Sequence, residues 1–320
     1  MHQRWVESMQ VILSDAERGL LEALVQNSRY TPAIIGQLIG KSRNWVSRTI
    51  KGLVKSGAIR SYTTIIDPAH VQGTRETILF MKSNPREQDV SSKLMDMEEL
   101  ESLDGIAGDF SLLGTFRFDS QGAFENLLDR VDSVVASSGA GKYNIVQVLT
   151  TYKKNRFTII PSSSPESYLS RKELALLRVM YRHEPTVENP FPLTQEEIGT
   201  RMNPPLSQPA VSKSIEKLMI KRAIIGYSIS TDFSLIGLPV KFFVRIKVSP
   251  GTASDIAQKL TSMREVWDLY RTSEDYSLLA MVRISSVMAF NQFLRRLYES
   301  KDVLDTESYI SLEEWFLPIR

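Results

Sequence analysis

The sequence contains no cysteine and only three histidines in 320 residues. Without cysteine the chain forms no disulfide bond and offers no thiol nucleophile, iron–sulfur cluster or Cys-ligated zinc site. His2, His70 and His183 lie far apart, which argues against a His-based catalytic or metal site. The apolar runs are shorter than the ~18–20 residues that span a bilayer, and the first residues lack the apolar stretch of a signal peptide. We therefore expect a soluble, cytoplasmic protein that carries no cofactor and contacts no membrane.

Acidic residues are scarce near the amino end, although the whole chain has a net charge of only +2. Residues 14–66 contain eight Lys or Arg against three Asp or Glu, whereas residues 74–155 contain nine basic against thirteen acidic side chains. This asymmetry indicates that one segment meets a polyanion and its neighbour does not. The apolar share of 42% and the length are typical of a globular chain with roughly two to four domains.

Two different blocks of sequence recur in the same order at a nearly constant spacing. Residues 36–62 align with residues 199–227, and residues 108–128 align with residues 274–294. Chance is a poor explanation for two such matches, so the sequence predicts a duplicated two-domain unit. The expected domains are 1–72 (winged helix-turn-helix with an N-terminal arm), 73–156 (βαββαβ domain), 157–236 (linker and second winged helix-turn-helix) and 237–320 (second βαββαβ domain).

The first block is helical. Ser42 is a good N-cap for a helix in which Val46, Ile50 and Leu53 fall on one face. Residues 61–67 are typical of a strand that follows this helix. Three short helices, a tight turn and then a strand predict a winged helix-turn-helix. The preceding helix is expected to bury a stripe formed by Ile34, Ile35, Leu38 and Ile39.

The second block alternates between apolar and polar residues. Residues 241–248 place apolar side chains at every second position, as in a half-buried strand. A helix, two strands, a second helix and a final strand follow, and residues 76–152 give the same order. This β-α-β-β-α-β order predicts a ferredoxin-like domain. The predicted fold class is therefore α+β, with two winged helix-turn-helix domains alternating with two ferredoxin-like βαββαβ domains.

Basic and polar side chains share one face of the third helix, opposite its buried stripe. Residues 41–60 contain six basic side chains and no acidic one. Arginine can bond guanine and asparagine can bond adenine in the major groove, while lysine neutralises phosphates. This pattern predicts binding of double-stranded DNA by Arg43, Asn44, Ser47, Arg48, Lys51 and Lys55.

The second copy of this helix is less basic. Pro209, Glu216 and Ile220 stand where the first copy has Asn44, Lys51 and Lys55. Two interpretations stay open, namely a second DNA-contacting helix or a degenerate copy that is kept for packing. The DNA-contacting interpretation assigns Gln208, Ser212, Lys213 and Lys217 to the interface.

Between Asp15 and Gly73 the helix Ser42–Leu53 is followed by Gly57-Ala58-Ile59, Tyr62, Asp67-Pro68 and Gly73. With this pattern the segment resembles the Lrp/AsnC (feast/famine) transcriptional regulators. The second blocks resemble the effector-sensing domain of that family. The family's Gly-x-aromatic-Asp loop corresponds to residues 108–111 (GDFS) and 274–277 (EDYS), where Ser replaces the last Asp in both copies and Glu274 replaces the Gly.

This resemblance implies a regulator whose sensing domains self-associate as a homodimer or a larger assembly. A fused pair of domains can form such a dimer within one chain, or two chains can exchange partners. The resemblance also implies a small-molecule effector such as an amino acid. The effector-binding positions that it implies are Gly108, Asp109, Ser111, Asp275 and Ser277.

Two other classes compete with this interpretation. Sirohaem decarboxylases resemble the same winged-helix plus βαββαβ arrangement, and chemistry on a tetrapyrrole carboxylate needs His and Arg donors. Residues 106–116 and 270–284 contain no His, so only Tyr270, Arg271 and Tyr276 remain as candidates, and we do not expect an enzyme. A sensor that has lost DNA binding is the third class, and the basic helix face argues against it.

Overall fold

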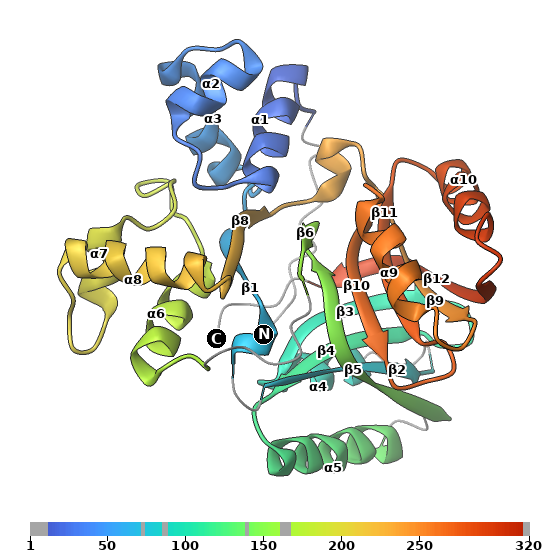
Figure 1. Cartoon of the computed structure of the whole chain (residues 1–320). Coiled ribbons are helices and arrows are strands. Elements are labelled where there is room, and N and C mark those ends of the chain that lie inside the picture. The colour runs from blue at the N-terminus through green and yellow to red at the C-terminus, as the bar shows by residue number, and fades with distance from the viewer. Residues whose placement is uncertain (1–11, 72–73, 85–88, 138–140, 161–167, 316–320) are drawn as a thin grey trace. The chain divides into compact units, whose positions relative to one another are not determined.

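The computed structural model describes residues 12–71, 74–84, 89–137, 141–160 and 168–315. The chain divides into two compact units, each assembled from separate segments of sequence (Figure 1). The first unit comprises Met1–Ile66 and Lys172–Pro239, and the second comprises Asp67–Arg171 and Val240–Arg320. The predicted α+β class is confirmed. Both helix-turn-helix segments lie in the first unit, and both βαββαβ segments lie in the second.

The first unit contains both helix-turn-helix segments. Each segment has three helices in the same order, followed by a strand. The elements of the first segment are α1 (Asp15–Gln26), α2 (Pro32–Ile39), α3 (Arg43–Lys55) and β1 (Ser61–Ile66). Those of the second are α6 (Arg171–Tyr181), β7 (Arg182–His183), α7 (Gln195–Arg201), α8 (Gln208–Ile220), β8 (Ile224–Ser230) and the 3-10 helix η2 (Phe233–Ile236).

Local sequence signals fix the helix ends of the first segment. Ser14 and Glu17 form a capping box at the start of α1, and the Ser42 hydroxyl accepts from the Trp45 backbone N–H at the start of α3. After α3 the chain turns at Gly57, whose φ of 74° is favourable for glycine. The expected stripe on α2 is wrong in part, because Ile35 is buried whereas Ile34 and Leu38 are exposed.

The strand after α3 does not fold back as a wing. Instead, β1 pairs antiparallel with β8, the corresponding strand of the second segment. Thr63 faces Ser228 in the middle of this ladder, and these two residues occupy corresponding positions of the two helix-turn-helix segments. The ladder therefore relates the two helix-turn-helix segments by an approximate two-fold axis, and β7 extends the sheet beside β1.

The second unit contains both βαββαβ segments. The first has η1 (Pro68–His70), β2 (Arg75–Lys82), α4 (Asp89–Met95), β3 (Leu100–Ala107), β4 (Leu112–Phe118), α5 (Gln121–Ser137), β5 (Lys142–Lys154) and β6 (Phe157–Thr158). The second has β9 (Val240–Val248), α9 (Ala253–Ser262), β10 (Val266–Thr272), β11 (Leu278–Ile284), α10 (Val287–Tyr298) and β12 (Val303–Trp315).

Eight strands of this unit form a closed antiparallel ring. Their order is β10-β11-β9-β12-β3-β4-β2-β5, and β5 pairs again with β10, while β6 lies outside the ring beside β5. Two seams, β12–β3 and β5–β10, join the two βαββαβ segments. The chain thus pairs its own two βαββαβ segments.

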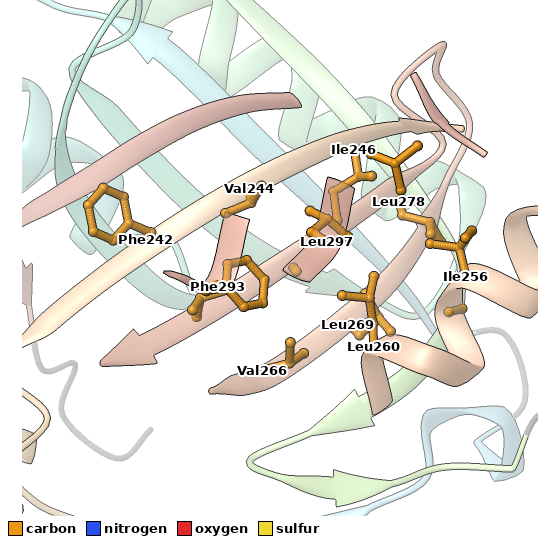
Figure 2. Packing of buried hydrophobic residues seen from close by; sticks show 14 of the residues in the cluster. Phe242, Val244, Ile246, Ile256, Leu260, Val266, Leu269, Leu278, Phe293 and Leu297 are labelled. Atoms are coloured by element: carbon orange, nitrogen blue, oxygen red, sulfur yellow. The ribbon is translucent and has the colours of Figure 1, made fainter. Parts of the chain in front are cut away.

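Helices cover the outer faces of the ring. On the carboxyl-terminal side Phe242, Val244 and Ile246 of β9 pack against α9 and α10 (Figure 2). The rings of Phe242 and Phe290 stack with their centroids 3.7 Å apart. Since side chains alternate along a strand, the intervening residues of β9, such as Arg245, point to the opposite face, towards the inside of the ring. A matching cluster covers the amino-terminal side under α4 and α5.

In the part of the chain that the structure describes, every helix is too short or too polar to cross a membrane.

Candidate nucleic-acid interface and sensing turns

The predicted face of α3 lies at the surface of the first unit. Val46, Ile50 and Leu53 are buried, with exposed fractions of 3% or less, and they anchor the helix to its own core. The opposite face presents side chains of α3 to solvent, with Ser47 partly covered. The exposed side chains on this face are Arg43, Asn44, Arg48, Lys51 and Lys55.

A close approach of backbone fixes the angle between the paired helices of each segment. A Cβ atom on Gly36 would lie 2.5 Å from the Lys41 carbonyl oxygen, and one on Gly199 would lie 2.2 Å from the Leu206 carbonyl oxygen. Both contacts are too short for any side chain, so glycine is required where the turn passes the helix. The two segments therefore build the same tight turn before α3 and before α8.

The corresponding face of α8 is partly engaged within the protein. Gln208 Nε2 donates to Gln195 Oε1 at 2.9 Å, and Gln195 Nε2 donates to the Ser212 hydroxyl at 3.4 Å. Lys217 lies 3.2 Å from the Glu173 carboxylate. Lys213 is exposed, so the structure gives the four predicted residues of α8 unequal access to a ligand.

Arg29 joins the two helix-turn-helix segments, a role that no pattern in the sequence indicates. Its Nη1 donates to the Leu193 carbonyl at 2.5 Å, and its guanidinium lies 5.3 Å from the centroid of the Tyr227 ring. Burial lowers the pKa of Arg29. The Tyr62 hydroxyl donates to the Pro190 carbonyl at 2.7 Å, which adds a second bond between the segments.

The first predicted sensing turn follows β3. The Ser111 hydroxyl accepts from the Ser83 backbone N–H at 2.7 Å, and Asp109 is exposed. Gly108 has a φ of 143°, and a Cβ atom there would lie 2.8 Å from the Tyr309 ring. The absence of a side chain at Gly108 is thus what admits the ring of a residue from β12.

The second predicted turn follows β10. The side chain of Asp275 is 87% exposed and lies 3.6 Å from Lys247, while the Ser277 carbonyl accepts from the Thr272 N–H at 3.0 Å. Neighbouring Glu274, which was not assigned to the site, makes the stronger contacts. It bonds Arg245 of β9 and Asn144 of β5.

Charged side chains form buried or partly buried ion pairs at both seams. At the β12–β3 seam, Lys241 Nζ lies 2.8 Å from Asp104 and 3.2 Å from Glu314. At the β5–β10 seam, Lys154 Nζ lies 3.3 Å from Glu76 and donates to the Tyr270 hydroxyl at 2.9 Å. Burial would raise the pKa of Glu76, but Lys154 and Arg117 outweigh it and lower that pKa. Each seam thus includes an ionic network.

No group of three or more His, Asp or Glu residues that could hold a metal ion occurs among the described residues. The described residues do present an exposed cationic helix and buried ion pairs. These features and the closed strand ring define a helix-turn-helix protein with a paired α+β domain.

Known proteins support this definition. Residues 241–317 match the family model of the Lrp/AsnC ligand binding domain. The HTH-type transcriptional regulator LysM of Sulfurisphaera tokodaii is 30% identical over 116 residues, which span 35% of this chain and 78% of that protein. The LysM protein of Saccharolobus solfataricus is 25% identical over 153 residues, 46% of this chain and 96% of that protein. The chain belongs to the Lrp/AsnC family of HTH-type transcriptional regulators.

A solved structure shares the fold along almost the whole chain. The siroheme decarboxylase NirDL aligns with a TM-score of 0.58 over 94% of this chain and 92% of that chain. The sequence identity is 14%, so this likeness concerns the fold alone.

Proposed function

We propose that this chain is a sequence-specific regulator of transcription that binds duplex DNA chiefly through α3. The exposed basic face of α3, set against a buried stripe and a glycine-tightened turn, carries this proposal. A major groove accommodates such a helix, in which Arg43, Asn44 and Arg48 reach base edges. Lys51 and Lys55 supply phosphate contacts, and Ser47 bonds bases or backbone between them.

One chain supplies two reading helices. The β1–β8 ladder places the two helix-turn-helix segments about an approximate two-fold axis, as dimeric helix-turn-helix proteins do for two half-sites. Because α8 carries Glu216 and Ile220 in place of two lysines, its half-site differs from that of α3. We assign α8 a weaker contact made by Lys213, with Gln208, Ser212 and Lys217 released from their partners on binding.

We also propose how the domains of the chain arose and how they associate. The four domains 1–72, 73–156, 157–236 and 237–320 arose by tandem duplication, and each sensing segment finds its partner within the chain. Further self-association through the βαββαβ domains would bring several such chains to one DNA region. An amino acid or a similar small molecule, bound at Gly108, Asp109 and Ser111 or at Asp275 and Ser277, would tune that assembly.

Selection of bound duplexes from a random pool tests the proposal. We expect an enriched site with two unlike half-sites, and we expect Arg43→Ala to lose the preference at one position of the stronger half-site. Arg18→Ala is the matched control, since it removes the same charge from the exposed surface of α1. No enrichment, or an equal effect of the two variants, would contradict the assignment of α3.

The fold of NirDL raises an enzyme as the second candidate. The tyrosines that the sequence offers for such chemistry already have protein partners. The Tyr270 hydroxyl accepts from Lys154, and the Tyr276 hydroxyl donates to Asp305 at 2.7 Å. Titration with an iron tetrapyrrole discriminates the two functions, because a decarboxylase would show a bound-haem spectrum and loss of a carboxylate.

A further inference from the structure

We propose that Arg245 forms a carboxylate-binding site which the chain's own Glu274 fills. Arg245 Nη2 donates to Glu274 Oε2 at 2.6 Å, and Asn144 Nδ2 donates to Glu274 Oε1 at 2.7 Å. Both oxygens of one carboxylate are therefore held by donors from two different strands, β9 and β5, one from each βαββαβ segment. We call the side chains of Arg245, Asn144, Tyr276 and Phe80 the carboxylate cradle.

The cradle has the properties of a built site. The Arg245 side chain is only 13% exposed, and its guanidinium lies 4.7 Å from the Tyr276 ring centroid and 5.7 Å from that of Phe80. Burial would lower the pKa of Arg245, but Glu307 and Glu274 outweigh it, so the guanidinium stays charged. Nη1 of Arg245 bonds Glu307, which leaves Nη2 to the Glu274 carboxylate. Arg245 Nη2 and Asn144 Nδ2 each take one oxygen of the group in the cradle, and this pair of donors favours a carboxylate over a spherical anion.

Only one of the two sensing turns has this cradle. In the strand ladders Leu279 faces Arg245 and Leu113 faces Phe80, so Phe80 takes the equivalent place in the first segment. Gly108 likewise stands where the second segment has Glu274. The cationic donor and the internal ligand thus occur together in the second turn, and the equivalent positions of the first turn have neither.

This inference deepens the proposed sensing role of the second turn. While Glu274 occupies the cradle, a free carboxylate, including that of an amino acid, must displace it before it can reach Arg245. Displacement would also break the bond from Asn144, which ties the turn to β5 across the β5–β10 seam. Weakly binding carboxylates therefore do not reach Arg245 in the wild-type protein, because Glu274 occupies the carboxylate cradle.

Chemical rescue with acetate tests whether Glu274 occupies a carboxylate-binding site. We expect Glu274→Ala to lower the Tm of the full chain, because it leaves a buried guanidinium N–H without its partner. Replacing chloride by acetate at equal ionic strength should then recover half or more of the lost Tm. The wild-type Tm should not respond to the exchange, since its cradle is occupied.

Two controls separate this effect from general anion effects. Asp255→Ala removes an exposed carboxylate from α9, outside the cradle and both predicted turns, and should show no acetate response. The double variant Arg245→Met/Glu274→Ala should lose the rescue. Equal responses in all variants, or no response in Glu274→Ala, would overturn the proposal. Gel shifts on the same variants keep the outcomes distinct, since failure of DNA binding contradicts the proposed function and leaves the rescue result unaffected.

Discussion

Glu314 lies between two cations at the β12–β3 seam, and this position predicts how acid weakens the protein. Its carboxylate is 3.2 Å from Lys241 Nζ, and its Oε1 accepts from Arg283 Nη1 at 2.9 Å. Burial alone would raise the pKa of Glu314, but the two cations outweigh it and lower that pKa to about 2. Because the folded pKa is below the unfolded value, the pair stabilises the fold above about pH 4.5 and this stabilisation is lost as pH falls towards 2.

We expect Glu314→Gln to lower the free energy of unfolding at pH 7 by about 3 kcal/mol, since the pKa falls from its ordinary value of 4.5 to about 2 in the folded state. The difference between wild type and variant should shrink steadily between about pH 4.5 and pH 2. Urea unfolding at pH 7, 4 and 2.5 measures it. A difference that stays constant over this range would show that Glu314 acts by packing rather than by charge.

Two glycines of the first segment should respond oppositely to the same substitution. A Cβ atom on Gly36 meets the Lys41 carbonyl, so Gly36→Ala forces the α2–α3 turn apart and should cost about 1–3 kcal/mol. Gly52 lies inside α3 with nothing within 4 Å, so Gly52→Ala should stabilise the helix by ~0.5–1 kcal/mol. Thermal unfolding of both variants is the measurement, and two losses of similar size would refute the role of the close contact.

At the scale of the element, α3 should separate base reading from phosphate binding. Arg48→Ala should weaken specific binding by roughly 1–3 kcal/mol and relax the preference at one base pair. Lys55→Ala should weaken all duplexes about equally and reduce the slope of log affinity against log salt by ~1. Fluorescence anisotropy on a selected and a scrambled duplex at several salt concentrations tests both. If the two variants behave alike, α3 does not lie in the groove as proposed.

The helices and strands show which features of the fold sequence periodicity can predict. Caps and spacing predicted α3 and its buried stripe, because both depend on residues within one helix. They did not predict the partner of β1, because a strand whose partner lies 158 to 169 residues away looks like any short strand in sequence. The expectation that Ile34 and Leu38 are buried is wrong for the same reason, because apolar spacing marks a helix face without showing whether another element covers it.

At the scale of the molecule, the two seams lie beyond sequence reasoning for a physical reason. The bond between Lys241 and Asp104 joins residues 137 positions apart, and neither residue has a distinctive neighbourhood in the sequence. The resemblance allowed sensing domains to pair within a chain or between chains, and the strand ladders show pairing within the chain. The same closure brings Asn144 to Glu274, which is why the carboxylate cradle was not predicted.

The asymmetry of the whole molecule leads to one further expectation. The α8 face differs from that of α3 chiefly at Glu216 and Ile220, where α3 carries Lys51 and Lys55. Both α8 side chains are exposed, so Glu216→Lys/Ile220→Lys should fold normally and give the second helix two added phosphate contacts. We expect tighter binding to all duplexes, a salt slope steeper by up to about 2, and less discrimination between the two half-sites.

Glu22→Lys/Val287→Lys makes the same change of charge at exposed positions outside α3 and α8 and serves as the control. A gain in affinity shared equally by both double variants would reflect net charge alone. A gain confined to the α8 variant, with footprints that lengthen on the weaker half-site, would place α8 on the duplex beside α3. That outcome is the one the two-fold β1–β8 ladder leads us to expect, because the ladder holds both helices in one compact unit.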